Sequence, residues 1–463
     1  MEYEFVSQSG APRLILIYAG WAMDAGVFRG LRRPGYDIAV VWDYRNFVID
    51  WSFASSYCEI CIVAWSLGVY AASVSCGALE SRTTCRIAVN GTLYPVDRRL
   101  GIPPAIFAAT ADGLNERQLY KFYRRVCGSS DKFRKFSETM PRRELSELVD
   151  ELHTFLQDNI FVPDQIRRWD FALISSEDAI FPAVNQWRSW QGTPTVIAEG
   201  PHLPDMQKII DRYIIDKEQT EERFARGLTS YDEEASVQGK ITQLLEKCIC
   251  TPLIFSKIHQ HGSRILEIGS GTGRLSAVLD SAGENSYLEM WDLAGVPPLQ
   301  GRMRKFRNVD AELELGRLPS SSFDMIASAS TVQWFNSPTH FLAECLRVLA
   351  PGGFLVFSTF VRGNLWQVAE VTGRSLPLLT PKQWARIIPA GFKVLGAKAF
   401  REEMEFDSPL DVFRHLKLTG VDSLGRSGEA LNPVAAVRRF SRDLDGKYRI
   451  TYRPIIIILR KEI

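Results

Sequence analysis

Short, continuously apolar segments recur along this chain, each followed by residues with a helical pattern. Such runs are typical of parallel strands that helices cover on both faces. In the first half they are "LILIY" (14–18), "DIAVVWD" (37–43), "EICIVAW" (59–65), "RIAVNG" (86–91) and "DFALISS" (170–176). In the second half they are "RILEIG" (264–269), "SYLEMWD" (286–292), "FDMIASAS" (323–330), "GGFLVFSTF" (352–360), "KYRITY" and "IIIILR". The pattern predicts two successive α/β units, one in each half of the chain.

A highly charged segment, 214–240, separates the two series of strands. A chain of 463 residues exceeds one ordinary domain core. We therefore predict two domains, 1–215 and 222–463, joined near 215–222. The two halves share no motif and no repeat, which indicates a fusion rather than a duplication.

Composition excludes several classes of partner. The formal net charge of +1 offers no general attraction to nucleic acid or to anionic membranes. No apolar run approaches the roughly 20 residues of a membrane span, and the start "MEYEFVSQSG" lacks the pattern of a signal peptide. We expect a cytoplasmic protein without a nucleic-acid or membrane partner.

Eight cysteines raise the question of a metal site. Cys58 and Cys61 form a CxxC pair at the start of an apolar strand, but no second pair follows at zinc spacing. We interpret the cysteines as reduced, structural thiols and expect no metal.

In the second half, "RILEIGSGTGRLS" combines a strand, a glycine-rich turn and the start of a helix. Glu267 ends the strand, and Gly269, Gly271 and Gly273 allow the backbone to approach a ligand closely. Asp292 ends the next strand, where a carboxylate can accept both hydroxyls of a ribose. Asp310 stands where a carboxylate can meet an adenine amino group, and "CLRVLAPGGFLVFSTF" follows as helix, turn and buried strand. The glycine pattern alone also fits a dinucleotide-binding domain.

Together these motifs resemble class I S-adenosylmethionine-dependent methyltransferases, which implies a Rossmann-like fold over 222–463 with S-adenosylmethionine as cofactor. "ASASTVQWF" (327–335), "FSTF" (357–360) and "HLKLTGVDSLG" (415–425) further resemble the malonyl-ACP O-methyltransferases of biotin synthesis. So does "RFARGLTSYDEEASVQ", in which the resemblance implies that Tyr231 and Gln238 cap the methyl donor. Asp422 departs from the asparagine of that family's pattern.

Methylation of a carboxylate demands little acid–base chemistry. The acceptor is already ionised at pH 7, so the protein needs only to align it with the methyl group and to exclude water. Arg362 or Arg414 could hold the acceptor carboxylate; the alternative for each is a solvated surface arginine.

In the first half, "CIVAWSLGVYAAS" places Ser66 between a strand and a helix, as in a nucleophile elbow, with Ala64 in place of the usual first glycine. The alternative is a plain helix N-cap. His202 in "EGPHLP" could be its base, with Asp178 in "SSEDAIFPAVNQ" favoured over Asp97 in "NGTLYPVD" as the acid. The order Ser, Asp, His is that of α/β-hydrolases. The backbone N–H groups of Leu67 and Trp21 would form the oxyanion hole.

"YAGW", "AWSLGV", "NGTLYPVD…GIP" and "DAIFPAVNQ" resemble the short α/β-hydrolases that hydrolyse pimeloyl-ACP methyl ester, over about 1–215. About 70 polar, helical residues between the fourth and fifth strands are typical of a lid. Within them, 117–143 is rich in basic residues that could receive an acidic acyl carrier protein, unless they are only a solvated helix face. These residues are Arg117, Lys121, Arg124, Arg125, Lys132, Arg134, Lys135, Arg142 and Arg143.

The two resemblances imply one bifunctional enzyme of pimeloyl synthesis. The second domain would methylate malonyl-ACP, and the first would later hydrolyse pimeloyl-ACP methyl ester. Two other hypotheses remain open. The chain could join a general carboxylesterase or thioesterase to a small-molecule carboxyl methyltransferase, or its first half could be a non-catalytic docking module for the carrier.

Overall fold

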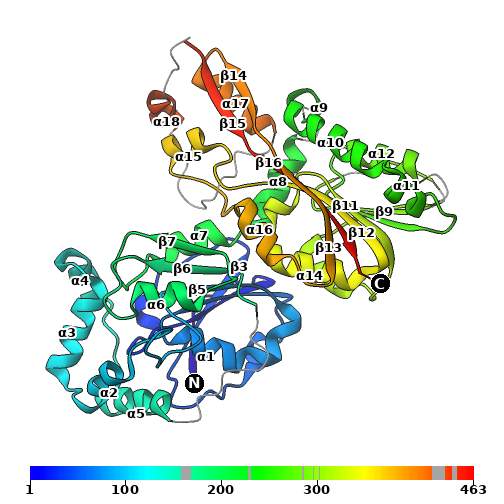
Figure 1. Cartoon of the computed structure of the whole chain (residues 1–463). Helices are drawn as coiled ribbons and strands as arrows, with labels where there is room; N and C mark the ends of the chain where they lie inside the picture. The colour runs from blue at the N-terminus through cyan, green and yellow to red at the C-terminus, as the bar shows by residue number, and fades with distance from the viewer. Residues whose placement is uncertain are drawn as a thin grey trace. The chain divides into compact units, whose positions relative to one another are not determined.

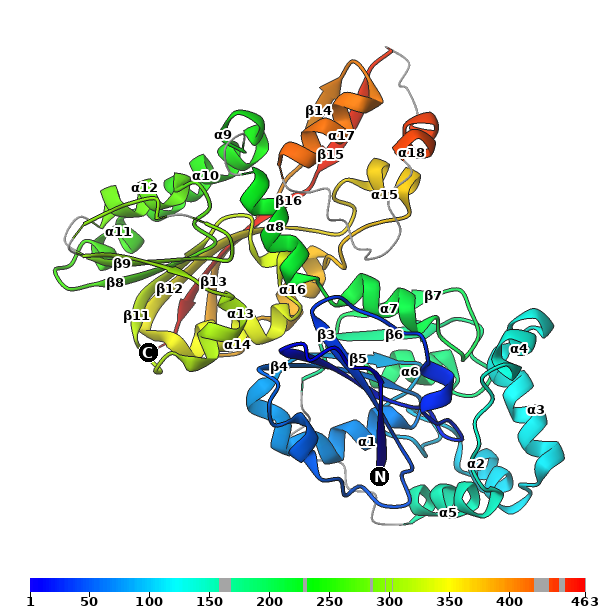
Figure 2. The same ribbon diagram turned by 180° about the vertical axis from the view of Figure 1, so that it is seen from behind.

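The computed structural model describes residues 1–157, 168–227, 231–283, 286–295, 297–301, 303–419, 433–440 and 446–462. The chain divides into two compact units, Met1–Ile210 and Asp211–Ile463 (Figures 1 and 2). The division lies just before the boundary predicted from sequence. Asp216 and Lys217, within the charged segment, are buried in the second unit, so this stretch belongs to the second core rather than to a free linker.

The first unit is built on a seven-stranded sheet in the order β1-β3-β2-β4-β5-β6-β7. Neighbours are parallel except β1, which pairs antiparallel with β3 at the edge. Five strands lie where apolar runs predicted them; β1 and β7 were missed, because one alternates polar and apolar residues and the other is very short. The strands are β1 Glu2–Ser7, β2 Arg13–Tyr18, β3 Tyr36–Trp42, β4 Glu59–Trp65, β5 Thr83–Val89, β6 Phe171–Ser175 and β7 Thr195–Ala198.

Helices surround this sheet. Those between β5 and β6 occupy the polar stretch that the sequence marked as helical, and they gather on one side of the unit (Figure 1). The helices are α1 Gly68–Ser75, α2 Pro104–Asp112, α3 Glu116–Cys127, α4 Ser130–Ser137, α5 Leu145–Leu156, α6 Ala183–Ser189 and α7 Met206–Tyr213, within which the division between the units falls. Among the described residues of the whole chain, no helix is both long enough and apolar enough to cross a bilayer.

The second unit has its own seven-stranded sheet, in the order β10-β9-β8-β11-β12-β16-β13, beside a two-stranded sheet of β14 and β15. β16 runs antiparallel to both of its neighbours, and the other pairs are parallel. β10, β13 and β14 were missed, because they lack a continuous apolar run. The strands are β8 Arg264–Ile268, β9 Tyr287–Asp292, β10 Arg304–Asn308, β11 Phe323–Ser328, β12 Leu349–Phe360, β13 Phe392–Ala399, β14 Glu402–Phe406, β15 Tyr448–Tyr452 and β16 Pro454–Lys461.

Helices cover both faces of the second sheet. α10, α11 and α12 lie along one side, and α13, α14 and α16 along the other (Figures 1 and 2). Buried side chains of α10 to α12 form one apolar core with those of β8, β9, β11 and β12. The helices are α8 Lys217–Gly227, α9 Tyr231–Glu234, α10 Ser236–Ile249, α11 Pro252–Ile258, α12 Arg274–Ala282, α13 Ala311–Glu314, α14 Pro338–Val348, α15 Trp366–Thr372, α16 Pro381–Ile387, α17 Pro409–Leu418 and α18 Pro433–Arg439.

Candidate functional site

Ser66 occupies a sharp turn between β4 and α1. Its φ of 60° lies in the left-handed region, which is strained for a residue with a Cβ atom. Its backbone N–H donates to the carbonyl of Val89 at 2.9 Å. The N-cap position of α1 is Leu67, and no side chain caps the helix there. The structure therefore contradicts the alternative that Ser66 is a helix N-cap.

Close backbone packing makes the strained turn possible. A Cβ atom on Gly68 would lie 2.5 Å from the carbonyl oxygen of Ala19, and one on Gly91 would lie 2.2 Å from the carbonyl oxygen of Ser66. Both positions therefore require glycine. Ala64 is fully buried in β4, so its methyl group is accommodated where the usual motif has glycine.

A chain of hydrogen bonds runs from Ser66 into the interior. Nε2 of His202 lies 3.0 Å from Oγ of Ser66, and Nδ1 lies 2.8 Å from Oδ2 of Asp178. All three side chains are buried. Asp97 instead closes its own turn, where Oδ1 accepts the backbone N–H groups of Arg99 and Leu100, each at 2.7 Å. Of the two candidate acids, Asp178 is the one bonded to His202.

Further residues hold this chain in place and were not recognised from sequence. Nε2 of Gln186 donates to Oδ2 of Asp178 at 2.9 Å. Nε1 of Trp65 and Nδ2 of Asn90 donate to the carbonyl oxygen of His202 at 3.0 and 2.8 Å. Gln186 ends the quoted "DAIFPAVNQ" motif, but nothing in the pattern says which side chain it contacts.

A cavity of about 60 Å³ opens beside Ser66. Trp21 and Leu67, the candidate oxyanion residues, line it. Nε1 of Trp21 donates to the carbonyl oxygen of Leu148 at 3.0 Å, which ties α5 to this wall. The other lining side chains are mostly apolar: Ile102, Ile106, Phe107, Thr110, Phe122, Arg125, Leu152 and Ile180.

The basic residues of 117–143 fall into two groups. Arg124 and Arg125 on α3, and Lys132, Arg134 and Lys135 on α4, are exposed, as are Arg117, Lys121 and Arg142. Arg143 differs, because its side chain is only 4% exposed and forms ion pairs with Asp43 and Glu151. Burial raises the pKa of Glu151, and Arg143 opposes that shift. Arg143 is therefore a buried structural residue, and its assignment to the basic surface was wrong.

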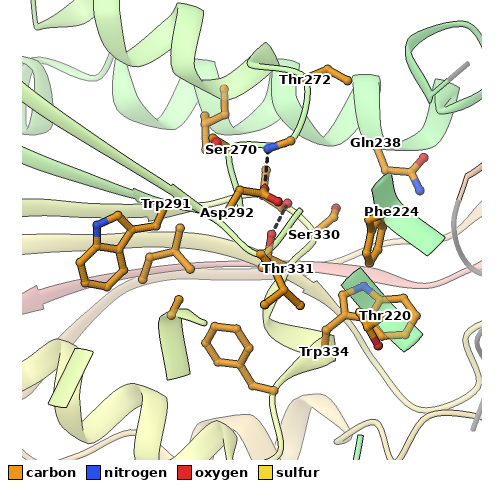
Figure 3. A pocket seen from close by; sticks show the side chains of 18 of the residues that line it. Thr220, Phe224, Gln238, Ser270, Thr272, Trp291, Asp292, Ser330, Thr331 and Trp334 are labelled. Atoms are coloured by element: carbon orange, nitrogen blue, oxygen red, sulfur yellow. Dashed lines mark hydrogen bonds between the residues drawn. The ribbon is translucent and has the colours of Figure 1, made fainter. Parts of the chain in front are cut away.

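The glycine-rich turn of the second unit borders a cavity of about 130 Å³ (Figure 3). Gly269 and Gly271 have positive φ and line it, together with Tyr231 and Gln238. A Cβ atom on Gly269 would lie 1.9 Å from Oγ1 of Thr331, so this position requires glycine.

Two predicted residues stand apart from the cavity. Gly273 is the N-cap of α12, and Glu267 lies fully buried beneath the turn; neither is among the lining residues. Oγ of Ser276 donates to Oε2 of Glu267 at 2.5 Å. Burial raises the pKa of Glu267 to about 8, so its carboxyl group is protonated at pH 7.

Both predicted aspartates line the cavity, and both also accept hydrogen bonds from backbone N–H groups. Asp292 accepts the backbone N–H of Gly271 through Oδ2 at 2.7 Å (dashed in Figure 3) and that of Ala294 through Oδ1 at 2.9 Å. Asp310 caps α13, where Oδ1 accepts the backbone N–H of Glu312 at 3.1 Å.

Lys217 is a buried cation beside this cavity that the sequence reasoning missed. Its Nζ donates to Oε2 of Glu312 at 2.9 Å and to the carbonyl oxygen of Trp334 at 3.1 Å, and it lies 3.5 Å from Oδ1 of Asp310. Burial raises the pKa of Glu312, and Lys217 opposes that shift. In sequence, Lys217 is one of many charges in the segment 214–240, so no signal distinguished it.

Several polar atoms at the cavity are buried without a hydrogen-bond partner among the described residues. They are Oε1 of Gln238, Oγ of Ser270 and Oγ of Ser330. Figure 3 shows Gln238 and Phe224 on the opposite side of the cavity from Asp292. Buried polar groups are normally satisfied, so these atoms indicate a ligand with polar groups.

Arg362 and Arg414 are exposed and are not among the residues that line this cavity. Residues 420–425 of the quoted "HLKLTGVDSLG" segment, with Asp422, lie outside the described residues. Within the described ranges, no cluster of His, Cys, Asp and Glu could hold a metal ion.

Each of the two units is similar to known proteins. Residues 1–203 match the family model "Pimeloyl-ACP methyl esterase BioG", and residues 266–357 match "Methyltransferase domain". A malonyl-[acyl-carrier protein] O-methyltransferase of Bacteroides fragilis is 32% identical over 98% of this chain and 94% of its own length. One of Haemophilus influenzae is 33% identical over 53% of this chain and 95% of its own length. The crystal structure of BioG from Haemophilus influenzae covers 44% of this chain and 94% of its own, with 32% identity and a TM-score of 0.40.

Proposed function

Because this chain belongs to the malonyl-[acyl-carrier protein] O-methyltransferases, in the form that joins a BioG domain to a methyltransferase domain, we propose that it both installs and removes one methyl ester. Family membership supports a role in biotin-precursor synthesis with methyltransferase activity. The second unit would methylate the free carboxyl group of malonyl-ACP. The first unit would hydrolyse the methyl ester of pimeloyl-ACP methyl ester.

The methyl donor is S-adenosylmethionine, and the predicted cofactor is thereby confirmed. The cavity of the second unit fits it. Gly271 has open space where a Cβ atom would stand, so its backbone can come close to a ligand. The buried oxygens of Ser270 and Gln238, which lack partners among the described residues, can bond to polar groups of that ligand. We propose that Asp292 accepts the ribose hydroxyls and that Asp310 meets the adenine amino group. Tyr231 and Gln238 would close the site over the donor.

The methyl transfer requires positioning more than proton transfer. Bound S-adenosylmethionine supplies an electrophilic methyl group, and the acceptor carboxylate is already ionised at pH 7. The lining side chains would align the two groups and exclude water, which replaces a bimolecular encounter with a prearranged one. No general base is needed.

For the first unit we propose an α/β-hydrolase fold. The mostly parallel sheet, the strained serine turn after β4 and the helices between β5 and β6 support it. The main support for catalysis by this unit is the pair of hydrogen bonds that joins Ser66, His202 and Asp178.

In this mechanism Oγ of Ser66 attacks the ester carbonyl carbon while Nε2 of His202 accepts the hydroxyl proton. The backbone N–H groups of Leu67 and Trp21 would stabilise the oxyanion. His202 then donates the proton to the methoxy oxygen, the carbon–oxygen bond breaks and methanol leaves. Water cleaves the acyl-enzyme by the same steps, which releases the carboxylate and restores Ser66. Asp178 orients His202 and stabilises its protonated form.

The partner of both reactions would be an acyl carrier protein, which carries the acyl chain as a thioester. Exposed basic residues on α3 and α4 support docking of an acidic carrier there. The proposed contact residues are Arg124, Arg125, Lys132, Arg134 and Lys135.

Two opposing activities in one chain require discrimination by chain length. Burying an unpaired carboxylate is costly, so the methyl group would protect the chain during elongation. Malonyl and pimeloyl groups differ by four methylenes, worth about 3 kcal/mol of apolar burial or roughly 200-fold in rate. The mostly apolar cavity beside Ser66 supports this selection. Equal hydrolysis of the two methyl esters by the full chain would contradict it.

Intact-protein mass spectrometry of the carrier tests the proposal. With malonyl-ACP and S-adenosylmethionine, wild type and Ser66→Ala should both add one methyl group. With pimeloyl-ACP methyl ester, the hydrolysis rate of Ser66→Ala should fall by at least about 10⁴-fold. Ser73→Ala, whose hydroxyl donates only to the backbone of Val69, is the matched control. Undiminished hydrolysis by Ser66→Ala would refute the esterase mechanism, and unmethylated malonyl-ACP would refute the methyltransferase assignment.

A further inference from the structure

A second, smaller cavity adjoins the methyl-donor cavity. The two share a wall made by Phe224, Tyr231, Gln238, Ser330 and Trp334. Resting on the function proposed above, we infer that this second cavity binds the carboxyl group that accepts the methyl group, and that Tyr452, held by His415, is the residue that orients it.

Figure 3 labels four residues of the shared wall, Gln238, Phe224, Ser330 and Trp334, among the side chains around the methyl-donor cavity. Ligands bound in the two cavities would contact the same side chains, which brings a methyl group in the first cavity close to an acceptor in the second. The arrangement therefore meets the positional requirement of the reaction, in which donor and acceptor must lie in contact.

The size of the second cavity suits a carboxylate group. Its volume is about 30 Å³, which is room for about two water-sized groups. Phe360, Leu376 and Leu378 form its apolar part. The two oxygens of a carboxylate group take up this space, and an acyl chain exceeds it.

Two polar atoms of the shared wall lack a hydrogen-bond partner among the described residues, Oε1 of Gln238 and Oγ of Ser330. Both atoms are buried. The backbone of Ser330 is also strained, with a φ of 53°, and its N–H donates to Oγ and O of Ser358 at 3.0 and 3.2 Å. A buried hydroxyl without a partner costs free energy, and an anionic oxygen in the cavity would satisfy it.

Tyr452 reaches the same cavity from β15. Its side chain is buried, and its hydroxyl lies 2.9 Å from Nε2 of His415. Nδ1 of His415 lies 3.7 Å from a carboxylate oxygen of Glu234. Burial lowers the pKa of His415 and raises that of Tyr452, so both groups are neutral at pH 7.

A neutral imidazole carries one proton, which can sit on either nitrogen. Glu234 favours the proton on Nδ1, and Nε2 then accepts from the hydroxyl of Tyr452. With the proton on Nε2 instead, His415 donates to the phenol oxygen, and the hydrogen of Tyr452 can donate to an anion in the cavity. Binding of a carboxylate selects this arrangement. His415 is therefore a positioning residue, and Tyr452 is the group that touches the acceptor.

Neutral donors also suit the chemistry better than a cation. The acceptor carboxylate loses its charge as the ester forms, so an ion pair would stabilise the substrate more than the transition state. Hydroxyl groups stabilise the substrate carboxylate less strongly than a cation does, so less of this stabilisation is lost in the transition state. Arg362 and Arg414, the acceptor candidates from sequence, are absent from the residues that line either cavity.

The test compares Tyr452→Phe with wild type in the full chain. KM for malonyl-ACP should rise about tenfold or more, because a hydrogen bond to a charged group is lost. Affinity for S-adenosylhomocysteine should change less than about twofold. Without turnover, protein saturated with S-adenosylhomocysteine should bind malonyl-CoA about tenfold more weakly. Weak binding of acetyl-CoA, which lacks the carboxyl group, should not change.

Tyr287→Phe is the matched control, because Tyr287 lies on β9 and lines neither cavity. His415→Gln, whose amide can replace the Nε2 contact, should lose less affinity than His415→Leu. If Tyr452→Phe does not fold, Ser330→Ala decides by the same binding measurement. Wild-type affinity for malonyl-CoA in Tyr452→Phe, or in Ser330→Ala where the first variant fails, overturns the inference. A wild-type protein that leaves malonyl-ACP unmethylated would instead overturn the proposed function.

Discussion

The two sites differ in how far the protein satisfies its own polar groups. In the first unit, Ser66, His202 and Asp178 are already joined by hydrogen bonds. Gln186 donates to Asp178, and only its own Oε1 lacks a partner among the described residues of this hydrogen-bonded group. In the second unit, oxygens of Gln238, Ser270 and Ser330 lack partners among the described residues. Proton transfer requires a donor and an acceptor within hydrogen-bond reach, and here the protein's own side chains supply both. Methyl transfer requires two bound ligands in contact, so the polar groups remain available for those ligands.

The largest expected effect comes from a substitution that interrupts the hydrogen bonds among Ser66, His202 and Asp178 at the acid. Asp178→Asn should lower kcat for pimeloyl methyl ester hydrolysis by about 10⁴-fold, because the amide favours the wrong tautomer of His202. Asp97→Asn, the competing acid, should retain activity within about twofold, since its carboxylate closes a local turn. Steady-state kinetics on the carrier-linked ester measures both. The reverse ranking would make Asp97 the catalytic acid.

The next effect concerns the buried ion pair beside the ligand cavity. Lys217→Met leaves Glu312 buried without its cation and should lower the free energy of unfolding of the second unit by about 3–5 kcal/mol. Lys240→Met removes an exposed pair with Glu402 and should cost less than about 1 kcal/mol. Denaturant titration followed by circular dichroism gives both values. Equal losses would show that Lys217 is no more than a surface charge.

A smaller effect concerns the basic surface of the first unit. Charge reversal at Lys132 and Lys135 should raise KM for the carrier-linked ester about tenfold at low salt and less at high salt. A small methyl ester without the carrier should be hydrolysed at the wild-type rate. Charge reversal at the exposed Lys393 and Lys398 of β13 is the control. A KM that is insensitive to both pairs would exclude α4 from carrier docking.

The smallest effect is a pH dependence beneath the glycine-rich turn. The folded-state pKa of Glu267, about 8, exceeds the ordinary value of 4.5. The folded protein therefore holds a proton that the unfolded chain releases, and this stabilisation is lost as the pH rises from about 4.5 through 8. Glu267→Gln cannot titrate, so its stability relative to wild type should grow by about 1 kcal/mol between pH 5 and pH 6.

Thermal and denaturant unfolding at several pH values tests this prediction. Glu246→Gln, on an exposed position of α10, is the control and should follow wild type at every pH. A difference between Glu267→Gln and wild type that stays constant with pH would mean that Glu267 is ionised in the folded protein throughout.

Apolar patterning predicted the central strands of both sheets, because strands buried on both faces must be continuously apolar. It missed the edge strands β1, β7, β10 and β13, where one face or one side meets solvent and polar residues are tolerated. The sequence also led us to place Lys217 in a linker and Arg143 on the surface, because a charged residue carries no sign of its burial in the sequence. Only the fold shows that each meets a carboxylate inside its unit.

By itself the sequence determined the two α/β units, the resemblance to the family and the candidate residues Ser66, His202, Asp292 and Asp310, because local motifs need particular residues at close spacing. The tertiary structure decided which acid meets His202, which basic residues reach solvent and where unpartnered oxygens surround a cavity. The physical reason is distance along the chain. The sequence favoured Asp178 over Asp97 without excluding either, and only the packing of β6 and its loop brings one carboxylate within 2.8 Å of the imidazole.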